Sequence, residues 1–195
     1  SNSPRLIDSE GRFAVKTRQG SAMLGTRLRV VDETGNDVPR NDETMGEIVV
    51  RGNQVMDRYW NKPDQTEEAF HDRVDGWFHT GDVATIDEHG MVKIKDRKKD
   101  IIISGGENIS SVEVEDALHE HPEVASVAVI GVPHKKWGET PKAIVVSTES
   151  ASLTAEEVTD FARDHLASYK CPTDVEFVDS LPETATGKIR KVALR

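Results

Sequence analysis

Several features that would assign a chain to a particular class are scarce in these 195 residues. The only cysteine is Cys171, so no disulfide can form within the chain, and we predict a reducing, cytoplasmic location. No apolar run approaches the roughly 20 residues of a membrane-spanning helix, so no transmembrane segment is expected. Positive charge is in deficit: 25 Lys and Arg against 35 Asp and Glu give a net charge of −10, which argues against nucleic-acid partners. The histidines show no spacing typical of metal ligands, so no metal site is predicted in this chain.

What the chain does contain is typical of a globular protein. Hydrophobic residues make up 36% and charged residues 31%, and the length suits one domain or two small ones. The positive charges are unevenly spread, and nine of the 25 lie in two short stretches, from Lys93 to Lys99 and from Lys188 to Arg195. Basic clusters on an acidic protein suit a polyanionic small molecule such as ATP or CoA, although solvated surface charge is the simpler interpretation for Lys93 and Lys95.

The residue pattern predicts two units of an α+β fold. Up to residue 97 the chain alternates strands and turns, with strands over 28–32 and 47–51, a hairpin over 83–95 and a short helix from Pro63 through Phe70. We therefore expect residues 1–97 to form a β-rich, barrel-like unit of antiparallel strands. Residues 98–195 alternate strands and helices, which predicts a small α/β domain with a mixed short sheet and flanking helices.

Helix starts in the second unit are marked by two capping patterns. Ser110 with Glu113, and Thr154 with Glu157, each place a hydroxyl three residues before a carboxylate. Strands are predicted over 101–103, 124–130, 143–147 and 175–178, because these runs are rich in β-branched and apolar residues.

Three segments contain residue types suited to nucleotide chemistry. Asp82 ends a Thr80-Gly81-Asp82 turn, where a carboxylate can accept hydrogen bonds from ribose hydroxyls or can simply cap the turn. Gly105 and Gly106 let the backbone approach a ligand closely or take positive φ. Lys188 follows Gly187 on a loop rich in Pro, Thr and Gly, which can carry an ammonium into a cleft or leave it in solvent.

Between the first two of these segments lies Asp96-Arg97-Lys98-Lys99-Asp100, and the glycine pair belongs to Ser104-Gly105-Gly106-Glu107-Asn108. In this order and spacing the segments resemble the adenylate-forming enzymes, and among them the AMP-forming acyl-CoA synthetases of the fatty acid–CoA ligase type. The resemblance runs from about Gly46 to Arg195. It implies that residues 1–97 correspond to the last β-rich subdomain of a large N-terminal domain. Residues 98–195 would be the small mobile C-terminal domain.

The resemblance also implies roles for individual residues. Asp82 and Arg97 would contact the ribose of ATP or AMP, and Lys188 would bind ATP and act as the adenylation catalyst. Lys99 would be the hinge of the small domain, or else a surface charge after a strand. Gly105 and Gly106 would line the channel for the pantetheine of CoA. In the loop expected over His134–Glu139, lysines would contact CoA phosphates or be solvated, with Trp137 packing.

By this resemblance the enzyme would activate a carboxylic acid, expected to be a medium- or long-chain fatty acid, with ATP to give acyl-AMP and pyrophosphate. The acyl group would then pass to CoA. The family's phosphate loop, acyl pocket and magnesium-binding glutamate have no match here, so the ligands of Mg²⁺ are expected in a missing N-terminal part. We therefore interpret the chain as a C-terminal fragment, inactive alone. A carrier-protein-loading adenylation domain, a luciferase-like oxygenase and a non-catalytic interaction domain on the same fold are the alternatives.

Overall fold

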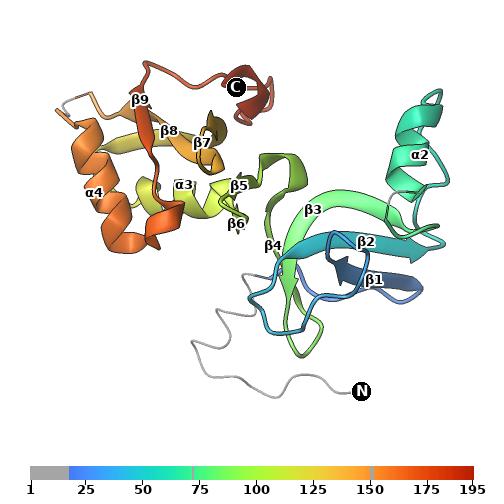
Figure 1. Cartoon of the computed structure of the whole chain (residues 1–195). Coiled ribbons are helices and arrows are strands. Elements are labelled where there is room, and N and C mark those ends of the chain that lie inside the picture. Colours follow the sequence, from blue (N-terminus) through green and yellow to red (C-terminus); the bar gives the residue numbers. More distant parts are fainter. Residues whose placement is uncertain (1–17, 72, 150–151) are drawn as a thin grey trace. The chain divides into compact units, whose positions relative to one another are not determined.

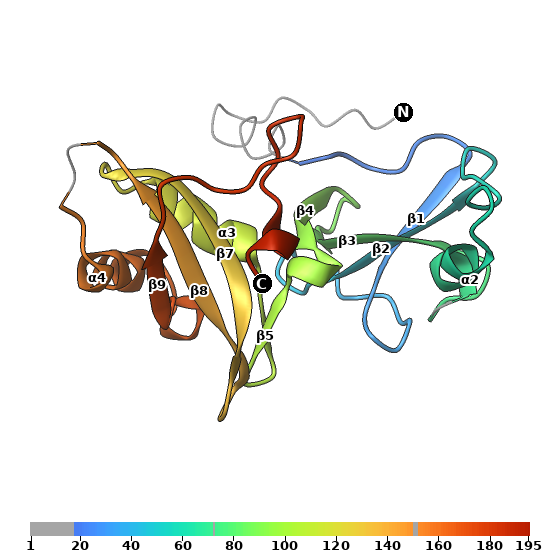
Figure 2. The same ribbon diagram turned by 90° about the horizontal axis from the view of Figure 1, so that it is seen from above.

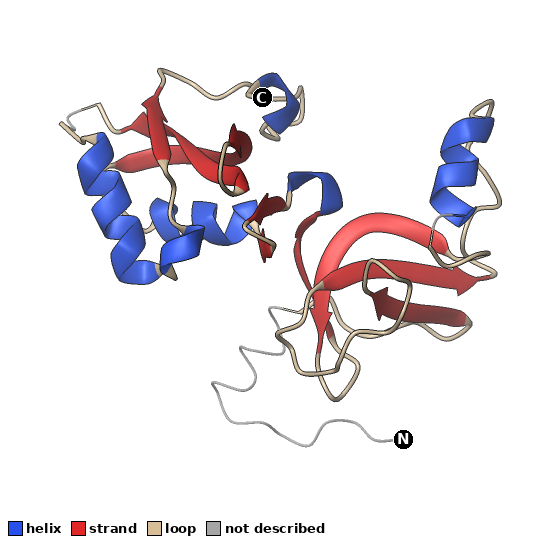
Figure 3. Ribbon diagram, viewed as in Figure 1, coloured by secondary structure: helices blue, strands red, loops and turns tan. Residues whose placement is uncertain are grey.

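The structure, a computed structural model, describes residues 18–71, 73–149 and 152–195. The chain divides into two compact units, Ser1–Lys98 and Lys99–Arg195. Each has its own sheet, and helices accompany both sheets (Figures 1 and 3). The fold is α+β, as the residue pattern predicts.

The first unit is an antiparallel sheet in the order β1-β2-β3-β4. Its strands are β1 (Thr26–Val31), β2 (Gly46–Gly52), β3 (Phe78–Ile86) and β4 (Val92–Arg97). The helix α2 (Pro63–His71) lies in the connection from β2 to β3 and begins at the proline that the sequence marks. β3 curves strongly, like the wall of a barrel (Figure 1), while β1 and β4 are the edges of the sheet among the described residues.

β3 is longer than the sequence suggests. A strand was expected from Val83, after a Thr-Gly-Asp turn, but β3 already begins at Phe78 and includes that turn. Local turn chemistry misleads here because Phe78 and His79 pair with Val50 and Val49 of β2, a long-range contact that composition does not reveal.

The second unit contains a mixed sheet in the order β6-β5-β8-β7, with β9 parallel to β8. The strands are β5 (Ile102–Ser104), β6 (Glu107–Ile109), β7 (Val124–His134), β8 (Gly138–Ser147) and β9 (Asp174–Phe177). Figure 2 shows the long β7–β8 hairpin and, near its tip, β5 beside it. The expected loop over His134–Glu139 is therefore only the three residues 135–137, because β7 and β8 pair out to His134 and Gly138.

The helices α3 (Ser111–His119) and α4 (Ala155–His165) pack against each other, α3 on β7 and α4 on β9. Both predicted caps are present: the Ser110 hydroxyl accepts from the Glu113 amide at 3.2 Å, and Thr154 and Glu157 form a reciprocal capping box.

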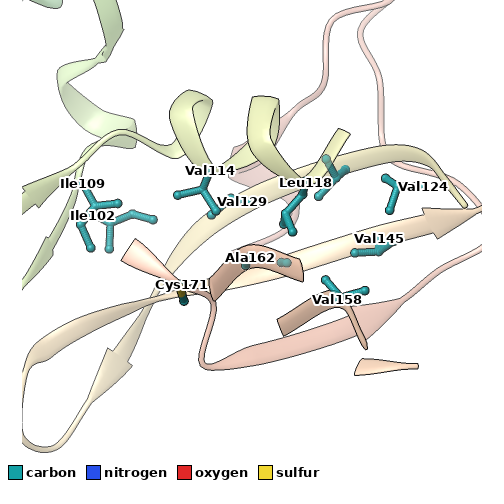
Figure 4. Packing of buried hydrophobic residues seen from close by; sticks show 12 residues of the cluster. Ile102, Ile109, Val114, Leu118, Val124, Val129, Val145, Val158, Ala162 and Cys171 are labelled. Carbon is teal, nitrogen blue, oxygen red and sulfur yellow. The ribbon is translucent and has the colours of Figure 1, made fainter. Parts of the chain in front are cut away.

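Side chains from both helices meet the sheet in one apolar core (Figure 4). Val114 and Leu118 of α3 and Val129 and Val145 of the sheet are completely buried. Cys171 closes this core, and burial raises the pKa of its thiol, which fits a structural role.

Shortening a buried valine of α3 tests this packing. Val114→Ala removes two methyl groups at a site with 0% exposure, so we expect a loss of about 2 kcal/mol of unfolding free energy for the second unit. Native-state hydrogen exchange at the Val145 amide measures it.

Val112→Ala is the matched control on the same helix. Because Val112 is 38% exposed, its replacement is expected to change stability by no more than about 0.5 kcal/mol. Equal losses for the two variants would contradict the assigned core.

Candidate functional site

The Thr80-Gly81-Asp82 segment bulges out of the β2–β3 ladder. Glu47 pairs with Val83 and Val49 pairs with His79, so the three residues lie opposite Ile48 alone. The Thr80 hydroxyl donates to the Ile48 carbonyl at 2.9 Å, and the Asp82 amide donates to the Thr80 hydroxyl oxygen at 3.1 Å. Gly81 has φ +72°, a conformation that glycine adopts without strain. Bulges of this kind re-aim side chains, and they are common beside active sites.

The structure brings Asp82 and Arg97 together. They are cross-strand partners in β3 and β4, and Arg97 Nε lies 3.0 Å from Asp82 Oδ1. The Asp82 side chain is 24% exposed and the Arg97 side chain 59% exposed, so a ligand can reach both. A carboxylate beside a guanidinium is suited to binding the hydroxyls and ring of a ribose.

A buried carboxylate that our reading of the sequence missed holds this bulge in place. Glu47 is 5% exposed, and its Oε1 accepts from the Gly81 amide at 3.2 Å. Its Oε2 lies 3.1 Å from His79 Nδ1 and 3.1 Å from Lys98 Nζ, and it also pairs with Arg73. A buried carboxylate is stable only with such partners, so Glu47 fixes the turn that carries Asp82.

The sequence offers only a weak signal for Glu47. It begins an apolar strand, Glu47-Ile48-Val49-Val50, where a charge at the edge of a run is normally solvated. Its partners are 26 to 51 residues away along the chain, so no local pattern links them to it.

Gly105 and Gly106 form the tight turn between β5 and β6, with φ of +61° and +90°. The Gly105 amide donates to the Trp137 carbonyl at 2.8 Å. A Cβ on Gly105 would lie 2.9 Å from an atom of the Trp137 ring, so the ring requires glycine there. The structure thus places the predicted glycine pair in contact with Trp137 of the His134–Glu139 segment, for which the sequence left two roles open.

Trp137 offers a surface beside this turn. The residue is 45% exposed, and Lys136 Nζ lies 4.1 Å from the ring centroid, a cation–π contact. Glu139 is hydrogen-bonded to β5, because its Oε2 accepts from the Ile103 amide at 3.3 Å. An aromatic ring, a lysine and an open glycine backbone together suit a thin polar ligand with phosphate groups.

Lys188 lies on an exposed, tightly closed loop. Thr184 and Lys188 exchange bonds, since the Thr184 amide donates to the Lys188 carbonyl at 2.8 Å and the Lys188 amide donates to the Thr184 hydroxyl oxygen at 3.1 Å. Gly187 takes φ +77° within the loop. Among residues 18–71, 73–149 and 152–195, none forms an ion pair with the Lys188 ammonium.

The base of this loop is fixed three residues later. Lys191 Nζ lies 2.7 Å from Glu115 Oε1 and 2.6 Å from Ser111 Oγ, both on α3. The Lys191 side chain is only 13% exposed, so this ion pair is shielded from solvent. The loop thus has a fixed base and an exposed cation at Lys188, an arrangement that leaves the ammonium accessible to an anionic ligand.

Lys99, the expected hinge, is exposed and lies in the 3-10 turn Lys98–Asp100, where the chain passes from one unit to the other. No group of three or more His, Cys, Asp or Glu that could hold a metal ion occurs in the part of the chain that the structure describes. The helices in that part are all too short or too polar to cross a membrane.

Two family models match the chain. Residues 6–60 match "AMP-binding enzyme" and residues 113–188 match "AMP-binding enzyme C-terminal domain". The chain belongs to the AMP-binding, adenylate-forming enzymes, as its three motifs predict, and its relatives are acid–CoA ligases.

The relatives act on different acids. The chain is 44% identical to the 3-methylmercaptopropionyl-CoA ligase of Ruegeria lacuscaerulensis, over 98% of this chain and 34% of the relative. It is 42% identical to the peroxisomal trans-cinnamate:CoA ligase of Petunia hybrida, over 97% of this chain and 33% of the relative. The chain thus spans about a third of the length of the curated relatives it matches. Because one relative is peroxisomal, the cytoplasmic location stays a prediction.

Among solved structures, ATP-bound MatB from Rhodopseudomonas palustris superposes with a TM-score of 0.81 at 40% identity, over 92% of this chain and 35% of that chain.

Removing the charge of Glu47 tests the support of the bulge. Glu47→Gln leaves Lys98 and Arg73 without their buried counter-charge, so we expect a loss of about 3 kcal/mol of unfolding free energy in the first unit. Hydrogen exchange at the Gly81 amide is expected to accelerate beyond this global effect. Glu43→Gln, on an exposed side chain of the same unit, is the control and should change neither. Unchanged exchange at Gly81 in Glu47→Gln would contradict the assigned support.

Proposed function

We propose that this chain supplies the nucleotide-facing β-rich subdomain and the small domain of an acid–CoA ligase. The observation that carries the proposal is the exposed ammonium of Lys188, which forms no ion pair with any residue that the structure describes, on a loop whose base Lys191 fixes to α3. An exposed ammonium of this kind contributes nothing to the stability of the fold, but it can bind a phosphate. Asp82 and Arg97 supply the complementary ribose contacts on the first unit.

In the first half-reaction the carboxylate of the acid attacks the α-phosphorus of ATP, the bond to the bridging oxygen breaks, and pyrophosphate leaves. Negative charge grows on the transferring oxygens and on the leaving group. The Lys188 ammonium would stabilise that charge, while Asp82 and Arg97 would hold the ribose in place. Mg²⁺ would neutralise the polyphosphate, and its ligands are expected outside this chain.

In the second half-reaction the CoA thiolate attacks the acyl carbonyl and AMP leaves. The turn at Gly105 and Gly106 would let the pantetheine pass close to its backbone: the side-chain position of Gly106 is open, and Gly105 lets the Trp137 ring pack against the turn. Trp137 and Lys136 would flank the more distal part of CoA. Lys99 would act as the hinge that exchanges the two faces of the small domain.

The proposed substrate class is a carboxylic acid. A medium- or long-chain fatty acid remains our finer proposal on the Ser104–Asn108 segment, although the named relatives act on methylmercaptopropionate and cinnamate. We propose further that the 195-residue chain alone does not catalyse the reaction, because it spans about a third of the active relatives.

Replacing Lys188 tests the first half-reaction. In the complete enzyme, Lys188→Ala is expected to slow acid-dependent pyrophosphate exchange by roughly 10²–10³-fold, the cost of one preorganised donor. Thioester formation from a supplied acyl-adenylate should survive. Lys62→Ala, another exposed lysine, is the control. Equal loss of both half-reactions would count against the assigned role.

Replacing Gly105 tests the second half-reaction. Gly105→Ala places a methyl group 2.9 Å from the Trp137 ring, so it must displace the ring and the turn. We expect thioester formation to fall by at least about tenfold, with pyrophosphate exchange retained.

Gly76→Ala, in the first unit, is the control for backbone strain. Gly76 also has a positive φ of +72°, its new methyl group would meet nothing within 4 Å, and it has no proposed role, so both half-reactions should be nearly unchanged. A larger loss of pyrophosphate exchange than of thioester formation in Gly105→Ala would overturn the assignment.

A further inference from the structure

The residue that precedes the expected hinge is tied to the first unit. Lys98 Nζ lies 3.1 Å from Glu47 Oε2, and the Glu47 side chain is 4% exposed. A charge pair with one buried member is screened much less than a surface pair, so this contact restrains Lys98. Through Glu47 the same restraint reaches the Gly81 amide and hence the turn that carries Asp82.

The residue that follows the expected hinge is tied to the second unit. Arg195 Nη2 donates to Asp100 Oδ1 at 2.7 Å and to the Lys99 carbonyl at 3.0 Å. Asp100 is 9% exposed, and Ile102, two residues on, lies in the core at 1%. The backbone is thus fixed again directly after Lys99.

The side chain of Lys99 itself is exposed, and no ion pair forms with its ammonium among the residues whose positions are described. Hinges are a few positions at element ends that absorb a large change in φ and ψ. Lys99 meets that description, with an anchored residue on each side.

We propose that Lys98 and Arg195 are positioning residues that confine the motion between the two units to the backbone at Lys99. Lys98 holds one flank to Glu47, and Arg195 holds the other flank through the Lys99 carbonyl and Asp100. The inference deepens the proposed function, because it adds two residues to the hinge on which the alternation of half-reactions rests.

The C-terminal segment that carries Arg195 also connects the hinge to the Lys188 loop. The same short segment begins at Lys191, which is fixed to Glu115 of α3, and it follows directly on the Lys188 loop. The base of the Lys188 loop and the second flank of the hinge therefore share one anchored stretch of five residues. A rotation at Lys99 moves this stretch as part of the second unit, so the Lys188 loop keeps its place on that unit.

Backbone relaxation of the ¹⁵N-labelled 195-residue chain tests the inference without any substrate. In the wild-type chain we expect order parameters near 0.85 on both flanks and a value below about 0.6 at Lys99 alone. Lys98→Met should extend the low values back to Lys98 and Arg97. Arg195→Gln should extend them forward to Asp100 and Ile101.

The controls remove charge elsewhere. Lys93→Met, on β4, and Arg163→Gln, on the exposed face of α4, should leave the profile unchanged, and Lys98→Arg should restore it. A general loss of stability would lower order throughout a unit rather than next to Lys99.

A profile that stays confined to Lys99 in both Lys98→Met and Arg195→Gln would overturn the inference, as would a low value spread over residues 97–101 in the wild-type chain. The measurement involves no catalysis, so its failure is distinct from a failure of the ligase assignment.

Discussion

The buried carboxylate of Glu47 is the interaction on which the Asp82–Arg97 part of the first unit depends. A carboxylate with 4% exposed side chain is tolerable only where cations and amide donors surround it. Its partners come from β3 and its bulge, from the connection before β3 and from the turn after β4: they are His79, Gly81, Arg73 and Lys98. One charge thus sets the position of the Asp82 turn and of the residue before Lys99.

In the second unit, too, a shielded ion pair supports a segment whose neighbouring functional residue is exposed. Lys191 is shielded and paired with Glu115, while Lys188, three residues earlier, extends into solvent. The turn at Gly105 is likewise fixed by the Trp137 carbonyl and packed against the Trp137 ring, while the next residue, Gly106, stays open. A rigid support under a free functional group is what transition-state stabilisation requires, because a group that is already oriented needs no reorganisation during the reaction.

The local part of this architecture was predictable from the sequence. Pro63 marks the start of α2, the hydroxyl–carboxylate spacings at Ser110 and Thr154 mark α3 and α4, and β-branched runs mark the core strands. The hairpin predicted over 83–95 brings the segments of Asp82 and Arg97 near each other, but their direct pairing depends on a register shift between Val83 and Ala84 that the sequence does not mark. The site roles of these residues stay predictions.

The remainder depends on contacts between distant residues. Neither the four-partner role of Glu47 nor the early start of β3 at Phe78 has a local signature. The start of β3 comes from its pairing with β2, and the partners of Glu47 also include Arg73 and Lys98, outside both strands. The Trp137 ring over Gly105 joins segments 32 residues apart, which only the β5–β8 pairing brings together. The central claim is that Asp82, Arg97 and Lys188 serve one nucleotide, and a crystal structure of the complete enzyme with a stable acyl-adenylate analogue tests it most directly. The account predicts the Asp82 carboxylate within hydrogen-bond distance of the ribose hydroxyls and, in the adenylation state, Lys188 Nζ at the phosphate position. An adenosine bound away from Asp82 and Arg97 would contradict it.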